Sequence, residues 1–174
     1  MEIIADLLKI ILPAALVLYA MYLMVSAFLK KQMDDSLLQT RSRQVEVSLP
    51  IRLQAYERVC LLLERITPNN ILIRLNGSAT TALEFQQILL RDVREEFNHN
   101  LSQQVYMSHE AWERVRNAQQ EVLTLINQAS ASVHPEAAPI ELSKKIFEKI
   151  IEENRNPTAE ALKFVKEEIQ RAFM

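Results

Sequence analysis

The run of uncharged residues from Ile10 to Leu29 constrains this chain more than any other feature. At about 1.5 Å rise per residue, a helix of that length covers the ~30 Å hydrocarbon layer of a bilayer. Pro13 falls in its first turn, where a missing backbone N–H costs little. Surface helices of globular proteins have a polar face, which this run lacks. The run therefore predicts a transmembrane helix, and we place an anchor at residues 1–31.

A cleaved signal peptide is the main alternative to a retained anchor. The small residues Val25, Ser26 and Ala27 resemble a processing site. However, Glu2 and Asp6 stand where a signal peptide would carry net positive charge, and the run exceeds the usual core of about 7–15 residues. We favour a retained anchor, and cleavage near Ala27, which would export the helical part, stays open as an alternative.

The basic residues around the run predict its orientation. Lys9 alone precedes the run, whereas Lys30, Lys31, Arg41 and Arg43 follow it. Basic residues close to a span stay on the cytoplasmic side. We therefore expect a single-pass protein of the bacterial inner membrane, with the domain after the span in the cytoplasm and with the lipid bilayer as one partner.

The composition predicts an all-α fold and makes nucleic acid an unsuitable partner. The chain has 174 residues, of which 49% are hydrophobic and one is glycine, so helix formers dominate and tight turns are rare. The formal net charge is −2, which gives no basic excess to neutralise phosphates. Cys60, the one cysteine, has no partner for an internal disulfide, and its apolar neighbours predict a buried thiol.

The sequence after the anchor predicts a linker followed by a small helical bundle. Residues 32–48 are polar and mixed in charge, which predicts a juxtamembrane linker. Between residues 49 and 129, apolar positions recur every three or four residues, as on amphipathic helices. Thr81 and Glu84 form a capping-box pattern, and Ser108 is placed to cap a later helix. The expected inward-facing residues are Leu49, Leu53, Tyr56, Cys60, Leu63, Ile66, Phe85, Leu89, Val93, Phe97, Ala111, Val115, Ala118, Val122, Leu125 and Ala129.

Two segments separate or follow these core helices. Residues 69–75 fit either a short helix or an extended piece, because so short a run does not distinguish the two periods. Residues 130–139 are rich in small residues and contain Pro135 and Pro139, which predicts a flexible linker. Beyond it, residues 140–174 predict two helices that pack as a hairpin, the second capped by Asn156.

The chain contains no sequence pattern typical of catalysis, of cofactor binding or of a metal site. A nucleophile elbow, a phosphate-binding glycine loop and a dinucleotide fingerprint are all missing from the sequence. The three histidines stand far apart, although His99 and His109 flank one loop and could meet. We therefore expect no catalytic residue, no cofactor and no metal. An unrecognised enzyme or metal-dependent sensor that uses His99, His109 and Cys60 is the alternative.

The loop that follows residue 98 is the best candidate for binding a partner. It gathers amide and aromatic side chains without charge, and these supply hydrogen bonds and large contact areas. A loop folded onto its own core would have the same composition, so this explanation stays open. The candidate partner-binding residues are His99, Asn100, Ser102, Gln103, Gln104, Tyr106 and Trp112.

Three segments resemble a family of uncharacterised proteins from Bacteroidetes bacteria. They are LPIRLQAYER at 49–58, ERITPNN at 64–70 and EEFNHNLSQQ at 95–104. The resemblance covers about residues 1–128, and it implies the bacterial inner membrane without implying an activity. Together with the anchor, it favours a helical interaction module, which would be an accessory or scaffold subunit of an inner-membrane complex. Such a module binds a protein partner or a second copy of itself.

Overall fold

The computed structural model describes the backbone of residues 2–153 and 156–173, and the side chains of residues 15–33, 49–152 and 156–171. Throughout these ranges the regular elements are helices, which confirms the all-α prediction. The chain divides into two compact units, Met1–Leu49 and Pro50–Met174. Helix α1, Glu2–Ile66, contributes its residues up to Leu49 to the first unit and the remainder to the second.

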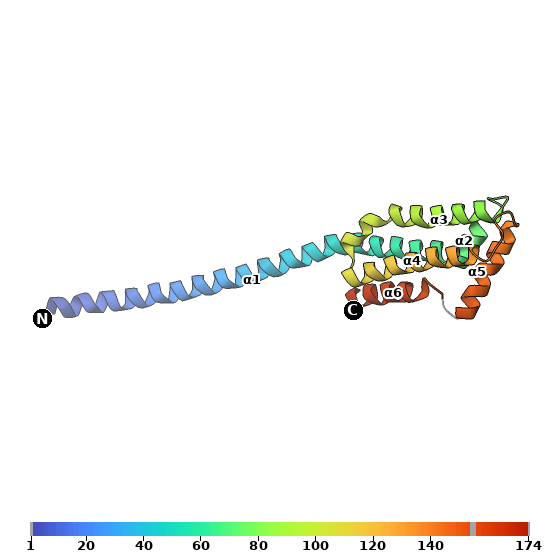
Figure 1. Ribbon diagram of the computed structural model, residues 1–174. Helices are drawn as coiled ribbons and strands as arrows, with labels where there is room; N and C mark the ends of the chain where they lie inside the picture. The colour runs from blue at the N-terminus through green and yellow to red at the C-terminus, as the bar shows by residue number, and fades with distance from the viewer. Residues whose placement is uncertain (1, 154–155, 174) are drawn as a thin grey trace. The chain divides into compact units, whose positions relative to one another are not determined.

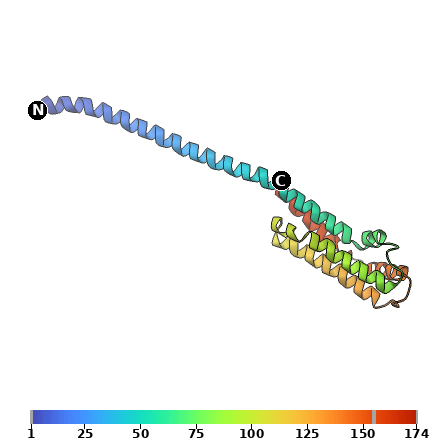
Figure 2. The same ribbon diagram turned by 90° about the horizontal axis from the view of Figure 1, so that it is seen from above.

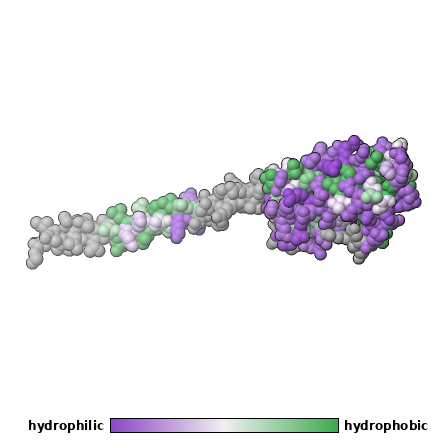
Figure 3. Space-filling view, viewed as in Figure 1, coloured by the Kyte–Doolittle hydropathy of each residue, from purple (hydrophilic) through white to green (hydrophobic). Residues whose placement is uncertain are grey.

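The described side chains of the first unit are exposed and mostly apolar. Residues 15–33 are exposed throughout, and Met24 reaches 74%. Figure 3 shows this part of the unit as largely green, whereas the visible face of the second unit is mostly purple. Residues 10–14 of the predicted span, and residues 34–48 of the predicted linker, lie outside the described side chains. Among the described residues, no helix combines the length and the apolar character needed to cross a membrane.

The second unit is a bundle of helices that run side by side (Figures 1 and 2). Successive members of the bundle alternate in direction, and further helices form the connections between them. Residues 69–75, for which the sequence allowed either a helix or an extended piece, belong to helix α2 as far as Arg74. The members that run side by side are Pro50–Ile66 of α1, α3 (Ala82–His99), α4 (His109–Ser130) and α6 (Ala159–Phe173); the connecting members are α2 (Pro68–Arg74), the 3-10 helix η1 (Leu101–Tyr106) and α5 (Pro139–Glu153).

The predicted helix caps are present at α3 and α4. The Thr81 hydroxyl accepts a hydrogen bond from the Glu84 N–H at 3.2 Å, and the Ser108 hydroxyl accepts one from the Ala111 N–H at 3.1 Å. The Glu84 carboxylate accepts a hydrogen bond from the backbone N–H of Thr80 at 2.8 Å, one residue before the position that a standard capping box uses. These bonds satisfy N–H groups that have no partner within the helix.

One hydrophobic core runs through the whole second unit and confirms most of the predicted inward-facing residues. Val59, Leu63 and Ile66 of α1 are fully buried, as are Leu89 of α3 and Val115 of α4. Three expected core positions differ, since Leu53 is exposed and Leu49 and Cys60 are half-buried. Leu53 lies about 120° around the helix from Val59, at the edge of the buried stripe.

The two C-terminal helices pack on the bundle instead of forming the predicted hairpin. Among the described residues, α5 packs against α3 and α4, and α6 packs against α4. Leu142 and Ile146 of α5, and Ala161 and Val165 of α6, belong to the same core cluster as α1. Packing against the larger helices of the bundle removes more apolar surface from water than two short helices bury against each other, which accounts for the difference.

The segment predicted as a flexible linker is hydrogen-bonded to the start of α3. The carbonyl of Ala137 accepts from the N–H of Ala82 at 2.8 Å, and the carbonyl of Pro135 accepts from the N–H of Leu83 at 3.1 Å. The first N–H groups of a helix need acceptors from elsewhere, and this segment supplies two of them.

We expect Leu63→Ala to lower the free energy of unfolding by about 2–5 kcal/mol, because it removes a fully buried side chain and leaves a cavity. Leu61→Ala is the matched control: its side chain is 55% exposed, so the change should stay within about 0.5 kcal/mol. Urea unfolding of the full chain, followed by far-ultraviolet circular dichroism, measures both. Equal losses from the two variants would contradict the core described above.

Candidate functional site

The amides of the candidate loop are partly used inside the protein. The Asn100 side chain donates to the carbonyl of Glu96 at 2.9 Å and so closes the end of α3. Gln103 is buried, and its side-chain amide donates to the Ser102 hydroxyl at 3.2 Å. These two residues satisfy polar groups of the bundle, as the alternative explanation of the loop predicts.

Trp112 also faces inward rather than toward solvent. It is 7% exposed, and its ring centroid lies 5.3 Å from that of Phe97 in a tilted arrangement. This pair fixes the end of α3 against the start of α4. A ring buried in this way offers no contact area to a partner in this structure.

The exposed surface of the loop is more apolar than its sequence suggests. His99, Ser102, Gln104 and Tyr106 are exposed, as expected of a contact surface. The neighbouring Leu101 and Val105, which were not among the candidate residues, are exposed too, and Val105 reaches 78%. Sequence reasoning missed them because it weighed amides and aromatics above aliphatic residues. The compact turns of η1 are what hold Val105 outward.

Arg52 attaches this loop to the first turns of α1 within the second unit. Its guanidinium Nε donates to the carbonyl of Tyr106 at 3.2 Å. Tyr106 is the last residue of η1, so the bond satisfies a carbonyl at the end of a helix. The apolar loop is therefore held at two points, by Asn100 at its start and by Arg52 at its end.

Glu168 joins three helices at the same end of the bundle. Its carboxylate accepts hydrogen bonds from the hydroxyls of Tyr56 and Ser108, and from the backbone N–H of Ser108 at 3.1 Å. Tyr56 belongs to α1, Ser108 caps α4, and Glu168 belongs to α6. The sequence gives no sign of this cluster, because Glu167-Glu168 looks like an ordinary solvated pair.

The cluster shifts the pKa values of its two acidic groups in opposite directions. Burial, and then the hydrogen bond to Glu168, raise the pKa of Tyr56 to about 12. Burial alone would raise the pKa of Glu168, but hydrogen bonds from Ser108 and Tyr56 and the charge of Arg52 together lower it. At neutral pH the cluster thus holds an ionised carboxylate and a neutral phenol.

The histidines do not form a metal site with the residues that the structure describes. His99 lines a shallow pocket of ≈ 340 Å³ with Arg65, Asp92, Glu95 and Glu96. Arg65 lies 2.5 Å from Glu96, and Arg74 makes two hydrogen bonds to Asp92. In the described part of the chain, no three His, Cys, Asp or Glu side chains are placed to hold a metal ion.

Cys60 belongs to the α1 segment of the bundle, and His99 and His109 belong to the end of α3 and the start of α4. It is half-buried, and burial raises the pKa of its thiol. A raised pKa keeps the thiol protonated at neutral pH, and the protonated form is a poor nucleophile and a poor metal ligand.

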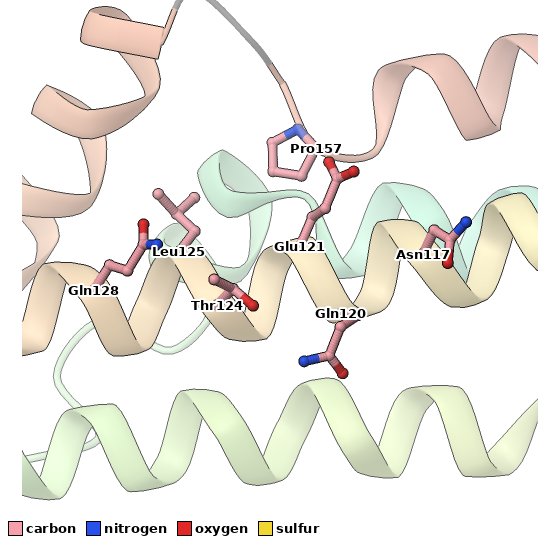
Figure 4. Close-up of a pocket in the computed structure, with 7 residues that line it drawn as sticks. All are labelled: Asn117, Gln120, Glu121, Thr124, Leu125, Gln128 and Pro157. Atoms are coloured by element: carbon pink, nitrogen blue, oxygen red, sulfur yellow. The ribbon is translucent and has the colours of Figure 1, made fainter.

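A second pocket lies along α4 and is lined mainly by polar side chains. Its volume is ≈ 380 Å³. Figure 4 shows Asn117, Gln120, Thr124 and Gln128 along the helix and Pro157 beside Glu121. Amides and a hydroxyl of this kind can form hydrogen bonds with a ligand.

A family profile places this chain among its relatives. The profile of the family of unknown function DUF7935 matches residues 2–172. The chain belongs to DUF7935. The match includes α5 and nearly all of α6, so the family extends beyond the residues 1–128 of the resemblance. No curated protein and no solved structure matches the chain.

Replacing Glu168 should weaken the bundle in a pH-dependent way. A lowered pKa adds stability above the ordinary carboxyl value of about 4.3, and this stability is lost as the pH falls through the folded value. We expect Glu168→Gln to lower the free energy of unfolding by about 1 kcal/mol at pH 7. This is less than the contribution of a buried hydrogen bond to a charged group, because the site is partly open to solvent. The variant should also lose less stability than the parent chain on acidification from pH 5 to pH 3.

Glu167→Gln is the matched control for this measurement. Glu167 is half-exposed and lies 3.8 Å from the Lys163 ammonium and 3.6 Å from the Arg171 guanidinium. Exposed ion pairs of this kind contribute little, so its loss should leave the unfolding curve nearly unchanged at each pH. The same acid dependence in both variants would show that the cluster does not stabilise the bundle.

Proposed function

We propose that this DUF7935 chain is a membrane-anchored helical interaction module. In this proposal the run Ile10 to Leu29 spans the bacterial inner membrane, and the second unit lies in the cytoplasm. There it serves as a non-catalytic accessory or scaffold subunit of a larger complex.

The observation that carries the proposal is the exposure of apolar side chains on every side of residues 15–29. Leu16, Val17 and Leu18 are consecutive and all exposed, and consecutive residues of a helix point about 100° apart. Such a helix has no polar face to turn to water. Leaving apolar surface in water costs about 25 cal/mol per Å², so a segment of this kind needs lipid or another helix around it.

The residues that follow support the orientation. Lys30 and Lys31 are exposed, and Arg41 and Arg43 come within the next twelve residues of the sequence. Positive charges close to a span are retained on the cytoplasmic side. The second unit follows them in sequence and would therefore share their compartment.

The exposed loop at η1 supports a role in protein contacts. Leu101, Val105 and Tyr106 offer apolar and aromatic contact area, and the bonds from Arg52 and Asn100 hold the loop in place. A surface that is ordered before binding loses less conformational entropy when a partner docks.

The full chain is expected to float with lipid vesicles in a density gradient and to stay with them in high salt and at alkaline pH. A chain that lacks residues 1–31 should remain in the aqueous fraction, because its apolar run is gone. Leu61→Lys in the full chain is the control. Leu61 is exposed in the second unit and lies outside the span, so this variant should still float with the vesicles. Release of the full chain by salt alone would contradict a spanning anchor.

The interaction role is tested on full-length protein from gently solubilised membranes, by native size and by mass identification of whatever co-purifies. We expect a defined complex that is lost with Val105→Asp, because a charge there must be desolvated on binding. Ile73→Asp, at another exposed aliphatic residue, should leave the complex intact. A monomeric parent chain, or equal losses from both variants, would contradict the proposal.

A further inference from the structure

Helix α5 has a second apolar stripe in addition to the one that it buries. Leu142 and Ile146 face the core, whereas Ile140, Phe147 and Ile151 are exposed, Ile151 by 75%. At 3.6 residues per turn the exposed three share one side of the helix, roughly 140° from the buried pair. A helix at the surface of a bundle needs one apolar stripe, so the second calls for another explanation.

The exposed stripe is self-complementary when two copies of α5 lie antiparallel. The midpoint between Ile140 and Ile151 is position 145.5 of the sequence. Lys144 and Glu148 are exposed and oppositely charged, and the midpoint between them is position 146. The two centres differ by half a residue, about 0.8 Å along the helix. One two-fold axis therefore brings Ile140 to the partner's Ile151 and Lys144 to the partner's Glu148.

We infer that the exposed stripe of α5 is a self-association surface through which two copies of this chain pair antiparallel. The charges select a second copy in this orientation, because a parallel pair would place Lys144 beside Lys144 and Glu148 beside Glu148. A two-fold interface uses the same patch on both copies, as this one does.

The existing ion pairs on α5 do not oppose this arrangement. Lys144 lies 3.0 Å from Glu141, and Glu148 lies 2.8 Å from Lys145. All four side chains are at least one-third exposed, and pairs in such settings contribute little stability. Exchanging one partner for another across the interface therefore costs little.

The size of the stripe makes the pairing weak unless the copies are held together. Three apolar side chains per copy fall well short of the about 1,200–2,000 Å² that stable interfaces bury. Anchoring in one membrane raises the effective concentration of each copy for the other. This part of the inference rests on the proposed anchor, whereas the geometry of the pair does not.

Disulfide cross-linking of the full chain in lipid vesicles tests the register. Two variants, Ile140→Cys and Ile151→Cys, carry different tags and are mixed before mild oxidation. We expect the mixed dimer to form. The Ile140→Cys homodimer should not form, because antiparallel copies hold their two residues 140 about 17 Å apart along the helix axis. A disulfide needs Cα atoms within about 7 Å. The parent chain controls for Cys60, and Ile73→Cys controls for random collision.

A charge exchange tests the same pairing independently. In the mixed-dimer assay, Lys144→Glu alone and Glu148→Lys alone should each lower the cross-linked yield, and the double variant should restore it. The double variant disrupts the pairs that Lys144 makes with Glu141 and Glu148 with Lys145, so neither of those pairs can account for a recovery. No recovery, or equal cross-linking at positions 73, 140 and 151, would overturn the inference.

The two proposals fail in distinguishable ways. Full chain that floats with vesicles but does not cross-link leaves the anchor standing and removes the self-association surface. Full chain that does not float removes the anchor. Cross-linking is then repeated in concentrated solution. A product that joins positions 140 and 151 supports the self-association surface, and the absence of that product refutes it.

Discussion

The burial of one side of the Pro50–Ile66 segment is the interaction on which the second unit depends. Val59, Leu63 and Ile66 are fully buried there, and the rest of the core packs around them. Partly exposed ion pairs join the same segment to its neighbours, Arg65 to Glu96 of α3 and Glu64 to Lys166 of α6. Such pairs contribute at most about 1 kcal/mol each, whereas one buried leucine contributes about 1.5–3 kcal/mol. The burial of apolar side chains therefore determines how the helices are arranged, and the ion pairs contribute less to that arrangement.

Polar contacts determine how the bundle is closed at the end that holds η1 and the first turns of the Pro50–Ile66 segment. Apolar stripes allow helices to slide and rotate by small amounts, since dispersion contacts have little directionality. The hydroxyls of Tyr56 and Ser108 remove that freedom by converging on the Glu168 carboxylate. Arg52 adds a bond to the end of η1 in the same region. The exposed aliphatic residues of the loop thus have a fixed support, which a surface for specific recognition requires.

The sequence predicted the features that depend on near neighbours and missed those that join distant residues. Thr81 and Ser108 were recognisable as caps because their partners lie three residues on. The core stripes of α3 and α4 followed from their period. In contrast, the bond between Tyr56 and Glu168 spans 112 residues, and no local pattern carries it.

The candidate loop shows the same division between local and distant information. Its composition was visible in the sequence, but the inward positions of Gln103 and Trp112 depend on how α3 meets α4. The C-terminal helices were recognised as helices and given the wrong packing partner. An apolar stripe shows that a helix is buried, and it does not show against which helix.

The hydrogen bonds from residues 135 and 137 to the start of α3 have a consequence for any shortened form of this protein. A chain that stopped at Ser130 would leave the N–H groups of Ala82 and Leu83 without these acceptors and would uncover the core where Leu142 and Ile146 pack. The helices of the second unit up to residue 130 are therefore an incomplete folding unit. A stop codon in this segment would therefore destabilise the whole bundle rather than trim an appendage from it.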